Sequence, residues 1–141
     1  MASPDSIQKE IDKIDAEIAK EEAKVPPDPD VIARLKREKE IKQLEKRIAI
    51  LDEAIGSLQR SIEKHAGQDI VPGLEAKLKE KETQRGDLQK ELSKKKKEHR
   101  IKELEKKIAD LTADDPDKNK KEIDKAQKEI EKLKEEIKAL G

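Results

Sequence analysis

The amino-acid sequence predicts an all-α protein, an up-down four-helix bundle from which the second and third helices project as an antiparallel two-helix coiled-coil stalk. Charged residues make up 48% of the 141 residues, hydrophobic residues make up 32%, and aromatic residues are absent. This composition is typical of coiled coils and long helices. The isoleucines and leucines recur at helical spacing, which favours folded helices over a disordered chain. The length is that of a single domain, predicted over residues 1–141.

The first helix is predicted over residues 4–24 and the second over residues 29–66. The prolines of the sequence VPPDPD separate them, because proline interrupts helical structure. The first helix has a single apolar stripe, formed by Ile7, Ile11, Ile14 and Ile18. The second helix repeats apolar residues with the alternating steps of a coiled coil, at Ile41, Leu44, Ile48, Leu51, Ile55, Leu58 and Ile62.

The third helix is predicted over residues 70–112 and the fourth over residues 116–140. The third has apolar residues towards both ends, at Leu74, Leu78, Leu88, Leu92, Ile101, Leu104, Ile108 and Leu111. The fourth has a regular coiled-coil repeat, at Ile123, Ala126, Ile130, Leu133, Ile137 and Leu140.

The apolar residues of the second and third helices match as an antiparallel pair. Facing residues in such a pair have a constant sum of residue numbers. The sum is 136 for Ile62 with Leu74, Leu58 with Leu78, Ile48 with Leu88, Leu44 with Leu92 and Leu35 with Ile101. We therefore predict a hairpin that turns near residue 68. The first and fourth helices should fold back on it, which gives a base of residues 1–46 and 91–141 and a stalk of residues 47–90.

The predicted stalk has a weak apolar seam. Lys81 and Arg85 fall opposite apolar residues of the second helix, so we expect their stems to lie along the seam with the charged groups in water. Gly86 costs its helix about 1 kcal/mol relative to alanine. We expect the stalk to be less stable than the base and to fray from its tip.

Both long helices lose their apolar stripe at one level of the predicted hairpin, in residues 37–40 and 93–100. A fusion of two helical pieces or a hinge would produce such a level. Alternatively, the first and fourth helices fill the core there and leave the lysines outside. We favour this last interpretation, which requires no special function.

Three predicted helix starts use the same formula, in Ser3-Pro4-Asp5, Asp28-Pro29-Asp30 and Asp115-Pro116-Asp117. The first residue caps free N–H groups, the proline suits the first helical position, and the aspartate favours the positive end of the helix dipole. Rule-based design produces this repetition. The cores contain isoleucine and leucine and the surfaces lysine and glutamate. With these features, the chain resembles a de novo designed helical bundle over roughly residues 1–50 and 95–141.

The stretch of residues 50–92 departs from this style. It contains four of the five glycines and many of the glutamines and serines, and its turn has no Pro-Asp cap. It looks like a natural antiparallel coiled-coil hairpin set into a designed base.

The turn of this hairpin is the candidate partner-binding tip, with His65, Gln68, Asp69, Ile70 and Val71. If Ile70 and Val71 are exposed, they form an apolar spot for a protein partner. The alternative, which we favour, is that one of them packs under the turn against Ile62. We also expect Gly67 to end the second helix in the left-handed conformation and Asp69 to cap the third.

The sequence shows no catalytic constellation, no metal-ligand spacing and no cofactor motif, so we expect no enzyme, no metal and no cofactor. It predicts an engineered scaffold that holds or presents the hairpin and requires no partner. One alternative is a natural coiled-coil module whose tip docks a protein. A weaker one is a nucleic-acid-associated arm that uses Lys94 to Lys97, although 34 basic and 34 acidic residues create no overall attraction.

The location expected from the sequence is the cytoplasm, as a soluble protein. No apolar run approaches the roughly 20 residues that span a bilayer, and the N-terminus has no apolar segment of the signal-peptide type. A monomer is the first expectation for the oligomeric state, and a homodimer formed through the weak stalk is the alternative.

Overall fold

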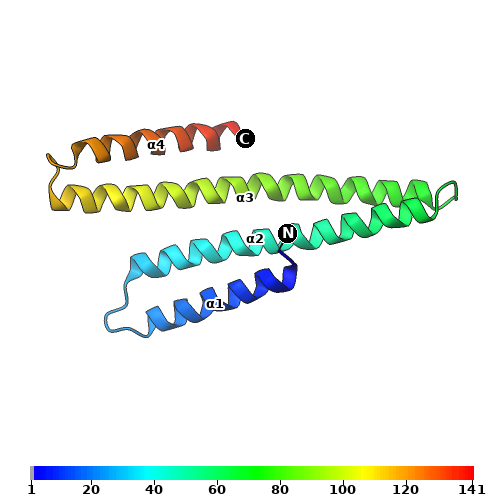
Figure 1. Cartoon of the computed structure of the whole chain (residues 1–141), viewed down its shortest axis with the longest axis horizontal. Helices are drawn as coiled ribbons and strands as arrows, with labels where there is room; N and C mark the ends of the chain where they lie inside the picture. The colour runs from blue at the N-terminus through cyan, green and yellow to red at the C-terminus, as the bar shows by residue number, and fades with distance from the viewer. Residues whose placement is uncertain (1) are drawn as a thin grey trace. The chain divides into compact units, whose positions relative to one another are not determined.

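The computed structural model describes residues 2–141. It contains four α-helices, α1 (Pro4–Glu22), α2 (Pro29–Lys64), α3 (Val71–Asp114) and α4 (Lys120–Ala139) (Figure 1). No strand occurs among the described residues, so the predicted all-α class is confirmed. The chain divides into two compact units, whose boundary lies within α3, between Leu92 and Ser93. The single domain over residues 1–141 stays a prediction.

The helices α1 and α2 begin at the predicted caps. Ser3 Oγ accepts a hydrogen bond from the Ser6 N–H at 3.1 Å. The Asp28 carboxylate accepts hydrogen bonds from the Asp30 and Val31 N–H groups at 3.0 and 3.4 Å. These N–H groups lie in the first turn, where a helix offers them no backbone acceptor, so the caps stabilise the helix starts.

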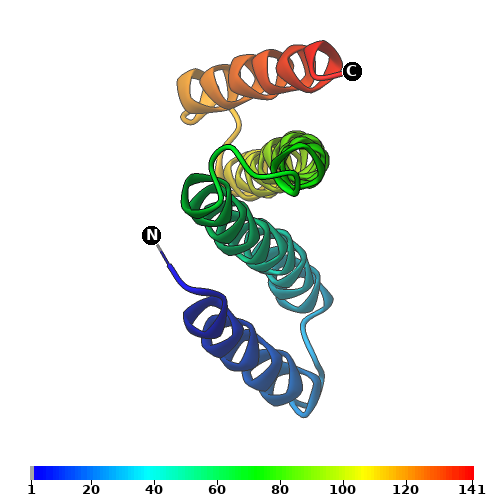
Figure 2. The ribbon, with the colours of Figure 1, turned by 90° about the vertical axis from the view of Figure 1, so that its right-hand side faces the viewer.

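The core of the first unit lies between α1 and the N-terminal half of α2, which run side by side (Figures 1 and 2). On α1 the predicted stripe is the buried face, where Ile7 and Ile11 are each only 4% exposed. The buried residues of α2 are Leu35, Ile41, Leu44, Ile48 and Ile55. Burial of each such side chain contributes about 1.5–3 kcal/mol, so this stripe is the main source of stability in the unit.

Polar pairs flank this core. Lys39 Nζ lies 2.7 Å from the Asp15 carboxylate, and Lys42 Nζ lies 3.1 Å from that of Glu10. Lys39 belongs to the charged segment 37–40, and here its partner is on α1. Within the first unit, the lysine therefore lies at the edge of the α1–α2 contact and outside its core.

The rest of α2 pairs with the N-terminal part of α3 in an antiparallel hairpin (Figure 1). Arg85 of α3 forms an ion pair with Asp52 of α2, and their residue numbers differ from the predicted sum of 136 by one. The seam is only half-buried at Leu58, Ile62, Leu74, Leu78 and Leu88. Two helices can enclose a seam from two sides only, so this part of the unit has a thinner core than the α1–α2 part.

The side chain of Arg85 differs in one respect from the sequence prediction. Its Nε is buried and contacts the Asp52 carboxylate, but the side chain as a whole is 39% exposed, so only part of the charged group leaves the water in which the sequence predicts it. The nearby carboxylate is the physical reason, because it neutralises a cation that would otherwise be costly to bury.

The second unit consists of the C-terminal part of α3 and α4, which lie side by side (Figures 1 and 2). Its core is formed by Ile101, Leu104, Ala126 and Ile130, with Ile108, Leu133 and Ile137 packed against it. Leu104 is 2% exposed. These are residues of the predicted stripes, so the predicted pairing of the last two helices accounts for this core.

The helix α4 begins at Lys120, later than the predicted start near Pro116. The Asp115 carboxylate does accept hydrogen bonds from the Asp117 and Lys118 N–H groups, at 3.2 and 3.1 Å. However, Asn119 Nδ2 donates to the Leu111 carbonyl at 3.0 Å. This bond back to α3 holds residues 116–119 as a separate turn, and the α-helix starts after it.

Candidate functional site: the hairpin tip and the stalk groove

The tip is a backbone turn between α2 and α3. The helix α2 ends at His65, whose N–H donates to the Ser61 carbonyl at 3.0 Å. The Gln68 N–H then donates to the His65 carbonyl at 2.9 Å, and the Val71 N–H to the Gln68 carbonyl at 3.2 Å. Gly67 has a φ of +79°, so the prediction that it adopts the left-handed conformation is confirmed.

A side-chain contact closes the same turn. His65 Nδ1 lies 3.1 Å from Gln68 Oε1. An amide oxygen can only accept, so the contact is a hydrogen bond when Nδ1 carries the proton. His65 is half-buried and Gln68 is exposed, which places both residues in the turn itself, with Gln68 on its outer surface.

The prediction that Asp69 caps α3 is wrong. The first residue of α3 is Val71, so Ile70 occupies the cap position, and its carbonyl accepts the hydrogen bond from the Leu74 N–H at 3.1 Å. Asp69 is exposed. The backbone bond between Val71 and Gln68 replaces the expected side-chain cap.

The two apolar residues of the tip have different environments. Ile70 is 51% exposed, whereas Val71 is half-buried, as is Ile62 of α2. The structure therefore brings the five predicted tip residues into one turn, with a single exposed large apolar side chain. An exposed isoleucine on a turn can form a small apolar contact with the surface of another protein.

The lysine run of residues 94–97 lies in the second unit. Lys94 and Lys96 are exposed. Lys97 Nζ lies 3.5 Å from the Glu136 carboxylate of α4. Nearby, Arg100 forms an ion pair with Glu129 at 3.2 Å. Acidic side chains of α4 thus interrupt the basic surface, which weakens its attraction for phosphate groups.

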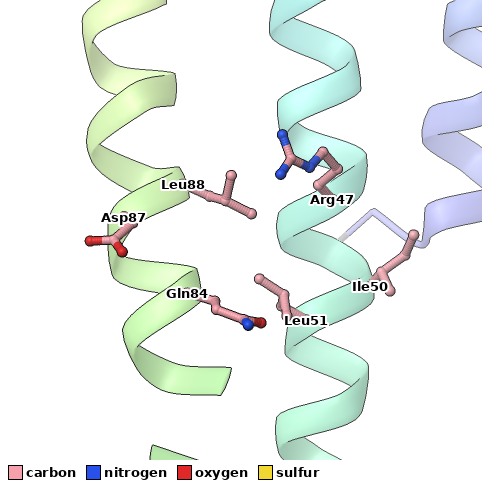
Figure 3. Close-up of a pocket in the computed structure, with 6 residues that line it drawn as sticks. All are labelled: Arg47, Ile50, Leu51, Gln84, Asp87 and Leu88. Atoms are coloured by element: carbon pink, nitrogen blue, oxygen red, sulfur yellow. The ribbon is translucent and has the colours of Figure 1, made fainter. Parts of the chain in front are cut away.

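A groove in the first unit was not predicted from the sequence. It lies between α2 and α3, has a volume of about 490 Å³, and is lined by Arg47, Ile50, Leu51, Gln84, Asp87 and Leu88 (Figure 3). Figure 3 shows Leu51 and Leu88 pointing towards each other between the helices. Ile50 is 48% exposed. Ile50 is an apolar residue outside the coiled-coil repeat of α2. This misplaced isoleucine is the sequence feature from which an apolar surface beside the seam could have been predicted.

Residues 2–141 contain neither a metal-binding cluster nor a membrane-spanning helix. Within this range, no group of three or more His, Cys, Asp or Glu side chains is placed to hold a metal ion. None of the described helices has the length and apolar character needed to cross a bilayer.

Comparisons with known proteins give no relative from which a function could be transferred. No protein-family model, curated protein or solved structure matches the chain.

Proposed function

We propose that this chain is an engineered structural protein without catalytic activity, which holds an antiparallel coiled-coil hairpin and presents its turn. In this proposal the α1–α2 and α3–α4 contacts are the designed part. The hairpin of residues 47–90 is of natural origin, and its tip is the part on display.

The observation that carries the proposal is the repeated Ser/Asp-Pro-Asp sequence at residues 3–5, 28–30 and 115–117. The first two copies start α1 and α2, and the third precedes the turn that leads into α4. Natural proteins cap helices in varied ways, because Ser, Thr, Asp and Asn are nearly equivalent as N-caps. Repetition of one solution is characteristic of idealised design rules. The lack of such a cap at the hairpin turn supports a separate origin for that segment.

Thermal unfolding followed by circular dichroism tests this proposal. Idealised designs are typically hyperstable, so we expect most of the helical signal to persist near about 90 °C. A single cooperative transition below about 60 °C, the range of ordinary natural domains, would contradict the designed origin.

The second candidate function is that of a natural interaction module whose tip docks a protein. The exposed side chain of Ile70 favours it. If a binding protein is found, Ile70→Ser should weaken its affinity by about tenfold, since burial of an isoleucine contributes about 1.5–3 kcal/mol. Val25→Ser, which alters an exposed apolar residue between α1 and α2, away from the tip and from the groove, is the matched control. Equal affinities of all three proteins would exclude the tip as the contact.

A further inference from the structure

The groove between α2 and α3 leaves apolar surface uncovered. Ile50 is 48% exposed, and Leu51 and Leu88 are only half-buried. Removal of apolar surface from water stabilises a protein. At the groove, α2 and α3 do not cover each other's apolar side chains. A third and a fourth helix laid over the groove would do so.

The groove also carries two opposite charges. Arg47 of α2 and Asp87 of α3 line it (Figure 3). Neither forms an ion pair within residues 2–141. The ion pair between Arg85 and Asp52 shows the register of the two helices. In this register, Arg47 and Asp87 lie on different helices, three residues or about 4.5 Å apart along the hairpin, a distance that a long arginine side chain can span.

We propose that this groove binds the same groove of a second copy of the chain. A two-fold interface requires a surface that complements itself. When α2 of one copy lies over α3 of the other, Arg47 of each copy faces Asp87 of its partner, so the ion pair forms twice. Leu51 and Leu88 of both copies then lie between these pairs and are removed from water, and Ile50, which Figure 3 shows on the side of α2 away from α3, lies at the edge of the interface.

The two charges favour a second copy of the chain as the partner of the groove. A two-fold interface needs a cation on one helix and an anion within its reach along the other, and the stalk provides both. An unrelated partner would need the same pair of charges in the same spacing. The proposal is independent of the engineered or natural origin of the chain, so its failure leaves the proposed function untouched.

Charge reversal at the two positions tests the proposal. Analytical ultracentrifugation at low salt, from about 1 µM to about 1 mM, should show a concentration-dependent dimer of the unmodified chain. Arg47→Glu places two pairs of acidic groups together, and Asp87→Lys places two pairs of basic groups together. Each variant alone should dimerise at least about 10-fold more weakly than the unmodified chain.

A mixture of the two variants provides the decisive measurement. In a mixed dimer, the glutamate introduced at position 47 of one variant would face the lysine introduced at position 87 of the other. The native Arg47 and Asp87 would face each other at the second contact, so both contacts are attractive again. Expected results are therefore weak self-association of each variant and restored association of the mixture. Lys77→Glu, which reverses a basic charge at an exposed position outside the groove, should leave the dimer unchanged.

Three outcomes would overturn the proposal. The first is an unmodified chain that stays monomeric up to about 1 mM, a concentration that detects even weak association. The second is a dimer that both reversed variants retain, and the third is a mixture that associates no more strongly than either variant alone. Circular dichroism of each variant verifies that the helical content is the same, as expected for exposed helix positions that receive good helix formers.

Discussion

At the scale of single residues, several polar side chains join one helix to another at the edges of the cores. Lys42 of α2 lies 3.1 Å from Glu10 of α1 and 3.3 Å from Glu45 of its own helix. Lys46 Nζ donates to Gln8 Oε1 at 2.6 Å. These contacts join α1 to α2 beside the apolar core that the two helices share.

The pKa of Lys42 provides a test of these contacts. Burial lowers this pKa, but the hydrogen bonds and charges of Glu10 and Glu45 outweigh burial and raise it above the usual 10.5. A raised folded-state pKa means that the stabilisation is complete below pH 10.5 and is lost as the pH rises through the folded-state value. The difference in unfolding free energy between the unmodified chain and Lys42→Met should therefore shrink between about pH 9 and about pH 11.5. Urea denaturation at both pH values measures it, and a constant difference would contradict the assignment.

The cap of α2 provides a second test at the same scale. Asp28→Ala removes the acceptor of two backbone N–H groups, so it should lower the free energy of unfolding by about 1 kcal/mol. Asp30→Ala is the matched control, since it removes an acidic residue from the same turn but not the cap, and its effect should be smaller. Urea denaturation of both variants measures the two losses. Equal losses would show that charge, and not the cap, stabilises this end.

At the scale of elements, the helices differ in how much of their surface they bury. Among the described residues of α3, only Ile101 and Leu104 are buried, both towards its C-terminal end. The N-terminal part of α3 contacts α2 alone in the first unit, so its stability depends more on helix propensity than that of the other helices.

Two glycines of the hairpin allow a test of this dependence. Gly86 lies within α3, and a Cβ there would meet no atom within 4 Å. Gly86→Ala should thus raise the free energy of unfolding by about 0.5–1 kcal/mol, because alanine restricts the unfolded chain and favours the helix. Gly67 has a φ of +79°, so Gly67→Ala should lower it by about 1 kcal/mol. Urea denaturation should therefore show changes of opposite sign in the free energy of unfolding for the two variants. A loss at Gly86 would show that the hairpin does not tolerate a side chain there.

At the scale of the whole molecule, burial is concentrated in two separate cores. In the first unit the most buried side chains lie between α1 and α2, and in the second they lie around Leu104. The hairpin segment 58–78 contains no buried residue. Its backbone is held by helical hydrogen bonds with little apolar contact to support them, which lowers the free energy of local opening.

Hydrogen exchange of the native protein tests this distribution. Amides in residues 58–78 should exchange faster than those in residues 41–48 and 101–108, because local opening of the hairpin exposes little apolar surface. Mass spectrometry of peptides from the exchanged protein resolves these segments. Uniform protection along the chain would mean that the hairpin unfolds only together with the cores.

Much of the fold follows from the sequence, because its information is local and periodic. The spacing of Ile7, Ile11 and Ile18 makes one face of α1 apolar whatever lies against it, and that face is buried. The caps at Ser3 and Asp28 act on the first turn of their own helices, so no distant residue is needed to predict them.

The sequence by itself therefore determined the all-α class, the helix periodicity, two helix starts and the left-handed turn at Gly67. Only the tertiary structure decided the features that depend on a neighbour. Asn119 delays the start of α4 through a bond to α3, and backbone bonding in the turn leaves Asp69 without a capping role. The groove at Ile50 likewise exists because α2 and α3 meet beside that residue without covering it. A stripe specifies which side chains are apolar, whereas packing specifies which of them remain in water.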